Sequence, residues 1–120
     1  MSLNGLSFGT IEDYVGRELG TSEWLTIDQH RIDAFADVSQ DHQWIHTDLE
    51  RAEASPLGST IAHGYLSLSL LSHFQFEIGV FPGDVSSILN YGLDRVRFLA
   101  PVKSGQRKWP ISIWPDTRLL

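Results

Sequence analysis

One segment of this 120-residue chain constrains its fold more than any other, the apolar stretch over residues 59–79. Its large side chains recur at helical spacing on two faces: Leu66, Leu70 and Phe74 on one, and Leu68 and Leu71 on the other. Small serines interrupt them; Ser59 or Thr60 is expected to cap the helix, and Gly79 to end it. A helix that is apolar on nearly all sides must be buried on nearly all sides. In a chain this short, only a sheet that curls around the helix can provide that burial.

The flanking sequence predicts another helix before this stretch and strands after it. Thr26 and Gln29 fit a capping box, and apolar residues at helical spacing follow them, which predicts a helix over residues 28–38. The pattern changes to that of strands over residues 86–91 and 93–100. The chain is therefore expected to combine a buried helix with a sheet.

Composition indicates a single domain over residues 1–120, since two domains would each have too little core. The net charge of −6 argues against a nucleic-acid binder, which needs a basic face for phosphates. No run of about 18 apolar residues is present, so no membrane span is expected, and residues 1–10 lack the pattern of a secretory signal. The absence of cysteine excludes disulfides and thiolate ligands, and a cytoplasmic location is the default expectation.

The last fifteen residues, 106–120, differ from the rest of the chain and contain two of its five prolines and two of its four tryptophans. Pro110 and Pro115 lie where a strand would need N–H donors, so a central strand is not expected there. This atypical tail is expected to be either an unusual edge segment or an altered C-terminus, for example through a frameshift. In the second case, missing inner strands would leave the helix face that contains Leu66 partly uncovered.

Two groups of residues carry chemistry. Asp41 and His46 lie five residues apart in a loop after the first helix. A carboxylate and an imidazole act as general acid and base if they converge on one water, although the spacing alone is equally typical of two surface residues. Residues 60–64 lie at the start of the buried helix, where free N–H groups suit an oxyanion or a polarised carbonyl. Gly64 either lets a ligand approach the backbone or allows the helix to pack tightly on the sheet.

Three ordered motifs resemble those of one protein family. They are DHQWIHTD at residues 41–48, GSTIAHG at 58–64 and NYGLDRVRFLAPV at 90–102. Together they are similar to the MaoC-like dehydratases, the (R)-specific enoyl-CoA hydratases, and the third motif resembles the nodulation-protein-N-like branch. The resemblance covers about residues 15–105. It implies an α+β hotdog fold, in which a curved antiparallel sheet wraps a long central helix, usually within a homodimer.

The resemblance also implies roles for individual residues. In the family the motif aspartate and histidine, here Asp41 and His46, hold the catalytic water, and the amide of the helix-start glycine, here Gly64, polarises the thioester carbonyl. The implied reaction is addition of water to a trans-2-enoyl-CoA, without a metal or another cofactor. Candidate substrate-binding residues are Ala62, His63, Tyr65, Ser67 and Asn90. Packing is the alternative role for His63, Tyr65 and Ser67, and Asn90 is either structural or part of the pocket.

Three other interpretations stay open. His42 and His46 form an H-x-x-x-H pattern that on a helix could bind zinc, although Gln43 stands where a metalloprotease has its glutamate base. A catalytically compromised hotdog domain would act as an acyl-thioester-binding or interaction module. A hotdog thioesterase shares the fold but is not expected to carry these motifs.

Overall fold

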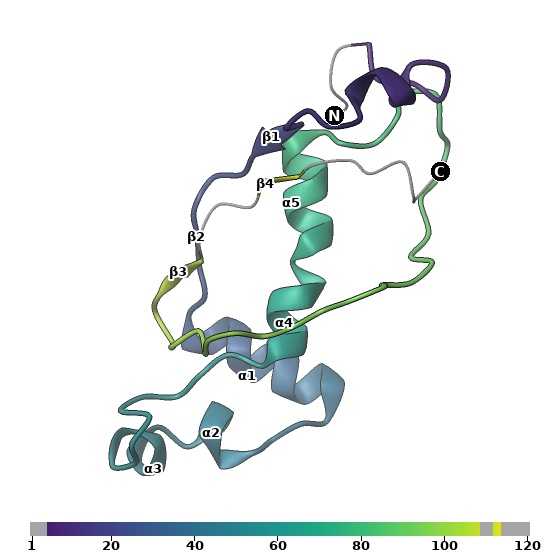
Figure 1. The fold of residues 1–120 in the computed structure, drawn as a ribbon. Coiled ribbons are helices and arrows are strands. Elements are labelled where there is room, and N and C mark those ends of the chain that lie inside the picture. The colour runs from purple at the N-terminus through teal and green to yellow at the C-terminus, as the bar shows by residue number, and fades with distance from the viewer. Residues whose placement is uncertain (1–4, 109–111, 114–120) are drawn as a thin grey trace. The chain divides into compact units, whose positions relative to one another are not determined.

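The computed structural model describes residues 5–108 and 112–113 (Figure 1). The chain divides into two compact units. The first unit comprises Met1–Glu23, Leu71–Arg95 and Pro110–Leu120, and the second unit comprises Trp24–Leu70 and Val96–Trp109. None of the helices found in the described residues is long and apolar enough to cross a membrane.

In its described residues, the first unit contains a 3-10 helix, an α-helix and a short antiparallel ladder. The 3-10 helix η1 (Ile11–Tyr14) precedes strand β1 (Gly20–Thr21), which pairs with β4 (Ser112–Ile113). Helix α5 (Leu71–Ile78) buries Phe74 completely. It ends at Gly79, as the sequence predicts, because the φ of 80° there is a left-handed conformation that glycine adopts without steric cost.

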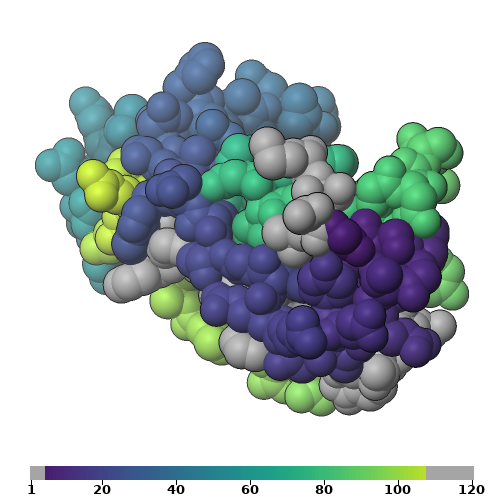
Figure 2. Space-filling view, turned by 90° about the horizontal axis from the view of Figure 1, so that it is seen from above, coloured from purple at the N-terminus to yellow at the C-terminus, as the bar shows by residue number. Residues whose placement is uncertain are grey.

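Four helices and a second ladder form the second unit. The helices are α1 (Gln29–Ser39), α2 (Trp44–Thr47), α3 (Leu49–Glu53) and α4 (Gly64–Ser69). Strand β2 (Leu25–Thr26) pairs antiparallel with β3 (Arg107–Lys108), and Figure 2 shows the yellow atoms of the β3 segment beside the blue atoms of the β2 segment. The atypical tail therefore contributes one strand to each ladder, through β3 and β4.

Helix α1 confirms the first predicted helix but has a different cap. The Asp28 carboxylate accepts a hydrogen bond of 2.9 Å from the Arg31 N–H and so satisfies a free donor of the first turn. Thr26 lies in β2, and the Gln29 side chain donates to the carbonyl oxygen of His46 at 2.8 Å. The predicted capping box is therefore wrong, because a closer carboxylate fills its role.

The apolar stretch forms two consecutive helices, α4 and α5, with Leu70 between them. Ser59 and Thr60 do not cap α4, which begins directly after His63. Instead, the carbonyl of Thr60 accepts a hydrogen bond from the N–H of Ser104 at 2.9 Å, next to the isolated bridge between Ile61 and Lys103.

Burial of the apolar stretch differs from both expectations. Leu66, Leu70 and Phe74 are 4%, 8% and 0% exposed, so the expectation that an altered tail would uncover this face is wrong. Burial on nearly all sides is also wrong, since Tyr65 is 73% and Phe76 is 55% exposed. The helices are amphipathic despite their composition.

The strands predicted over residues 86–91 and 93–100 are not present in the described structure. Side chains such as Leu89 and Leu99 are 87% and 91% exposed there. Alternation sets which way side chains point, but a strand also needs a neighbouring backbone to pair with. In the described residues the sheet consists of the two short ladders and an isolated bridge between Ile61 and Lys103.

Phe74 and Phe76 both lie on α5 but differ in exposure, so substituting each of them tests where the core of the first unit lies. Phe74→Ala is expected to lower the free energy of unfolding by about 3–5 kcal/mol, because the ring is fully buried. Phe76→Ala removes a ring that is half exposed and packs against the ring of Phe81, so it should cost no more than about 1.5 kcal/mol. Urea unfolding followed by circular dichroism measures both values, and equal losses would contradict the observed burial.

Candidate active site

The loop between α1 and α2 positions Asp41 and His46. Helix α1 ends because Gln40 adopts a left-handed backbone conformation, with φ 63°, which turns the chain out of the helix. Helix α2 begins at Trp44 and carries His46 in its last turn. The two predicted catalytic side chains therefore come from opposite ends of one short connection.

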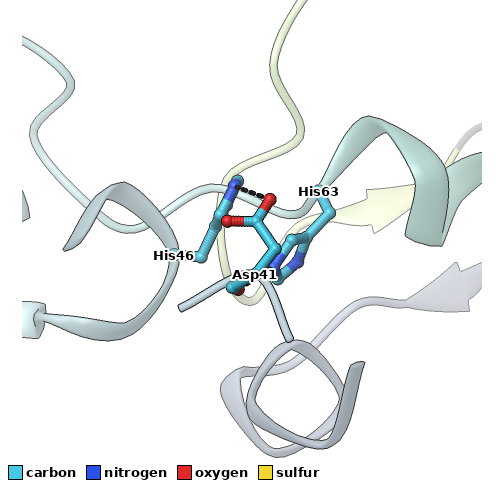
Figure 3. A group of neighbouring side chains, drawn as sticks. All are labelled: Asp41, His46 and His63. Atoms are coloured by element: carbon cyan, nitrogen blue, oxygen red, sulfur yellow. Dashed lines mark hydrogen bonds and ion pairs between the residues drawn. The ribbon is translucent and has the colours of Figure 1, made fainter. Parts of the chain in front are cut away.

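Asp41 and His46 face each other across a gap that is wider than a hydrogen bond (Figure 3). The Oδ2 atom of Asp41 lies 3.8 Å from Nε2 of His46. The Nδ1 atom of His46 lies 2.7 Å from the carbonyl oxygen of Ile61, which can only accept, so Nδ1 carries the proton. In the neutral ring, Nε2 therefore presents its lone pair to the carboxylate. The His46 side chain is 7% exposed and that of Asp41 39%, so a buried base faces a carboxylate open to solvent.

Hydrogen bonds keep the Asp41 carboxyl ionised. The side-chain amide of Gln43 donates to Oδ1 at 3.1 Å and is the main reason why the pKa of this carboxyl lies below its ordinary value of 3.8. Partial desolvation opposes the shift, whereas the Gln43 backbone N–H and the charges of His46 and His63 add to it. Because the folded-state pKa is lowered, the ionised carboxylate stabilises the fold above about pH 4 and loses this effect as the pH falls through the lowered pKa.

A third titratable side chain, His63, contacts both members of the pair. Its ring stacks on that of His46, with centroids 3.7 Å apart and an angle of 22° between the planes. Its Nε2 lies 2.9 Å from the main-chain oxygen of Asp41 and therefore donates to it. His63 is only 3% exposed. Its predicted contact with substrate stays a prediction, while the packing role has direct support.

These three residues are also a possible set of metal ligands, but their orientation is unsuitable. One ligand atom from each lies within 4.8 Å of the others. A metal bound by an imidazole lies close to the ring plane, and two stacked rings cannot both direct an in-plane lone pair at one ion. In the part of the chain that the structure describes, His42 does not join this group and instead lies 3.7 Å from Asp37 at the surface. The H-x-x-x-H pattern therefore does not bring its two histidines to one site.

Gln29 and Thr60 hold the loop in place, although the sequence did not indicate this role. Gln29 donates to the carbonyl oxygen of His46 at 2.8 Å, and the buried hydroxyl of Thr60 donates to the Gln29 side chain at 2.5 Å. These contacts span 17 and 31 residues, so no local pattern could have identified them. The contact between Gln43 and Asp41 could have been predicted from the sequence, because aspartate side chains commonly accept a hydrogen bond from the backbone N–H two residues later.

A cavity of about 510 Å³ opens beside this cluster within the second unit. Four predicted site residues line it: His46, Ala62, Gly64 and Ser67. The rest of the lining comes from Ile61 and residues 97–102. A methyl group at Gly64 would lie only 2.9–3.1 Å from three ring carbons of Phe98, so glycine leaves room for this ring. Phe98 is a lining residue that the sequence analysis did not single out.

Three predicted substrate-binding residues, His63, Tyr65 and Asn90, lie outside this lining, as does the predicted catalytic Asp41. Tyr65 is 73% exposed and makes an edge contact with Phe98, with centroids 6.2 Å apart. Asn90 belongs to the first unit, where it is exposed. Their contact with substrate stays a prediction.

Comparison with known families identifies the kind of domain. The family described as the MaoC like domain matches residues 10–108. The chain belongs to the MaoC-like domain family. A solved structure described as the monoamine oxidase regulatory protein from Archaeoglobus fulgius superposes with a TM-score of 0.66 and 32% identity, over 88% of this chain and 67% of that one. This confirms the predicted α+β hotdog fold.

Several relatives of this MaoC-like chain are known by name. Nodulation protein N of Rhizobium leguminosarum bv. viciae is 52% identical over 106 residues, which cover 88% of this chain and 66% of the relative. Nodulation protein N of Rhizobium meliloti is 46% identical over 118 residues, an alignment that extends into the atypical tail and covers 98% of this chain and 73% of the relative. The 3-hydroxyacyl-thioester dehydratase Z of Mycobacterium tuberculosis is 50% identical, over 77% of this chain and 60% of the relative. The chain thus spans about two thirds of the length of these relatives.

Replacing Gln43 tests the electrostatics of the Asp41 carboxyl. Gln43→Met removes the amide donor at similar size, so the pKa of Asp41 should rise toward its ordinary value of 3.8. Carbon-13 NMR of the carboxyl across an acid titration measures the pKa directly. Gln75→Met makes the same chemical change on α5 and should leave it unaltered; an unchanged pKa in Gln43→Met would show that this amide does not control the carboxyl.

Proposed function

We propose that this MaoC-like domain catalyses the reversible (R)-specific hydration of trans-2-enoyl-CoA thioesters to 3-hydroxyacyl-CoA thioesters. The observation that carries the proposal is the 3.8 Å separation of the Asp41 carboxylate from His46 Nε2, beside a cavity that Gly64 also lines. The cavity volume of about 510 Å³ is in the range of small-molecule sites. The name of the dehydratase Z relative supports an acyl thioester as substrate. A homodimer and a cytoplasmic location stay predictions.

The Asp41 and His46 pair suits the activation of water. Both facing atoms are hydrogen-bond acceptors when Asp41 is ionised and His46 Nδ1 carries the ring proton. A separation of 3.8 Å allows one water oxygen to lie at about 2.8 Å from each, with one hydrogen donated to each acceptor. The water oxygen then attacks C3 of the enoyl thioester, and one acceptor takes a proton from it. That proton is delivered to C2 on the same face, so the elements of water add completely.

Gly64 has the position needed to stabilise the charge that forms on the thioester oxygen. As the first residue of α4, it has no acceptor within the helix for its N–H. Attack at C3 moves electron density onto the thioester carbonyl, and a backbone donor fixed near that oxygen lowers the barrier. The lack of a side chain at Gly64 lets the Phe98 ring pack against this backbone, and both residues line the cavity.

Substitution of the pair tests the proposed reaction. Asp41→Asn and His46→Gln should each lower kcat by at least about 100-fold, because each replaces a proton-accepting base with an amide that does not take up a proton. Loss of the enoyl-thioester absorbance with a short trans-2-enoyl-CoA measures the rate, and chiral analysis of the product tests the (R) configuration. Asp37→Asn and His42→Gln are matched controls, because this exposed pair lies 3.7 Å apart at the surface. Equal activity of all four variants would exclude the assignment, and release of free CoA would indicate a thioesterase.

A backbone substitution tests the role of Gly64. Gly64→Pro removes the N–H, and proline is tolerated here because Gly64 is the first helical residue and His63 is extended, with φ −59° and ψ 138°. A Phe98→Ala background makes room for the added Cβ. In that background Gly64→Pro should lower kcat about 100-fold relative to Gly64→Ala, which retains the N–H. Similar rates for the two double variants would remove Gly64 from the mechanism.

A further inference from the structure

His63 differs from an ordinary packing residue in one respect. Its ring is 3% exposed, stacked on His46 and 5.0 Å from the tilted ring of Phe35. An apolar ring of similar size would fill this space. His63 instead brings a buried Nδ1 atom that has no hydrogen-bond partner among the described residues. Buried polar atoms without partners are rare because they lose their hydration, so another contact must favour histidine here.

That contact is the hydrogen bond from Nε2 to the main-chain oxygen of Asp41, at 2.9 Å. Asp41 follows Gln40, whose left-handed conformation ends α1, so its backbone has left the helical hydrogen-bond pattern. The Asp41 N–H itself has only a long contact of 3.4 Å to the Ser39 hydroxyl. The hydrogen bond from His63 is therefore shorter than the contact of the Asp41 N–H, and it holds the backbone at this position.

We infer that His63 is a positioning residue that fixes the Asp41 backbone through its Nε2–H while its ring sets the plane of His46. This inference rests on the proposed function, because it assigns His63 to the alignment of the same pair. Small displacements of reacting groups lower rates steeply, with about 1 Å costing on the order of 100-fold. His63 need not touch the substrate to have such an effect.

Two substitutions separate the hydrogen bond from the ring. His63→Phe retains a stacked ring but removes the donor to Asp41. His63→Gln removes the ring but places an amide N–H close to the position of Nε2. We expect kcat of His63→Phe to fall about 10- to 100-fold with KM changed less than about threefold, and His63→Gln to recover a substantial part of that loss. Wild-type kcat in His63→Phe, or a fall in His63→Gln as large as in His63→Phe, would overturn the inference.

His73→Phe is the matched control for the chemical change, because His73 lies on α5 and its side chain is 52% exposed. Its kcat should remain within about twofold of wild type. Thermal unfolding of each variant separates loss of fold from loss of alignment. An inactive wild-type chain, or an Asp41→Asn variant with full activity, would contradict the proposed reaction and leave the contacts of His63 to be judged separately.

The protonation pattern of the wild-type rings tests the role of His63 independently of catalysis, because it can be measured without an assay of activity. Long-range nitrogen-15 NMR of the imidazoles should show His46 protonated at Nδ1 and His63 protonated at Nε2, opposite tautomers in two stacked rings. A neutral His63 with its proton on Nδ1 could not donate to Asp41 and would overturn the inference, even if the hydratase reaction were established.

Discussion

Three hydrogen bonds between the 41–46 loop and the segment 61–63 determine the geometry of the candidate site. The Ile61 N–H donates to the carbonyl of Ile45 at 2.9 Å, and His46 Nδ1 donates to the carbonyl of Ile61 at 2.7 Å. The third runs from His63 Nε2 to the carbonyl of Asp41 at 2.9 Å. Because backbone groups serve as donor or acceptor in each, the two segments can separate only by breaking the arrangement that orients both imidazoles.

The segment at residues 60–62 connects this arrangement to the cavity. Its other edge bonds to residues 102–104: the Ala62 N–H donates to the carbonyl of Val102 at 2.7 Å, and the Ser104 N–H donates to the carbonyl of Thr60 at 2.9 Å. Residues 97–102, which line the cavity, are thus joined to the same short stretch of backbone that holds His46. The Thr60 hydroxyl also donates to the side chain of Gln29 in α1. Both α1 and residues 102–104 therefore hydrogen-bond to the segment that positions His46. These contacts hold His46 in the cavity wall, where Asp41 faces it at 3.8 Å.

Local patterns predicted what depends on local physics. The helical spacing of apolar residues predicted α1, and Gly79 predicted the end of α5. The resemblance to the family implied Asp41 and His46 as a pair, and their side chains lie 3.8 Å apart, while their catalytic role stays a prediction. Patterns failed where a distant group competed. Gln29 was assigned to a cap, but its amide meets His46 and Thr60, and the alternating residues 86–100 form no strand in the described structure, since alternation does not supply a partner. The stacking of His63 on His46 depends on packing between segments that no spacing rule describes.

The stacked imidazoles also restrict where positive charge can form. The ring nitrogens of the two histidines that lack a hydrogen-bonded proton have different surroundings. A second proton on His63 would have to occupy Nδ1, which is buried and has no acceptor among the described residues. A second proton on His46 would occupy Nε2, which faces the ionised Asp41 carboxylate. Of the two rings, His46 is therefore the one whose free nitrogen faces Asp41 and the site proposed for the water.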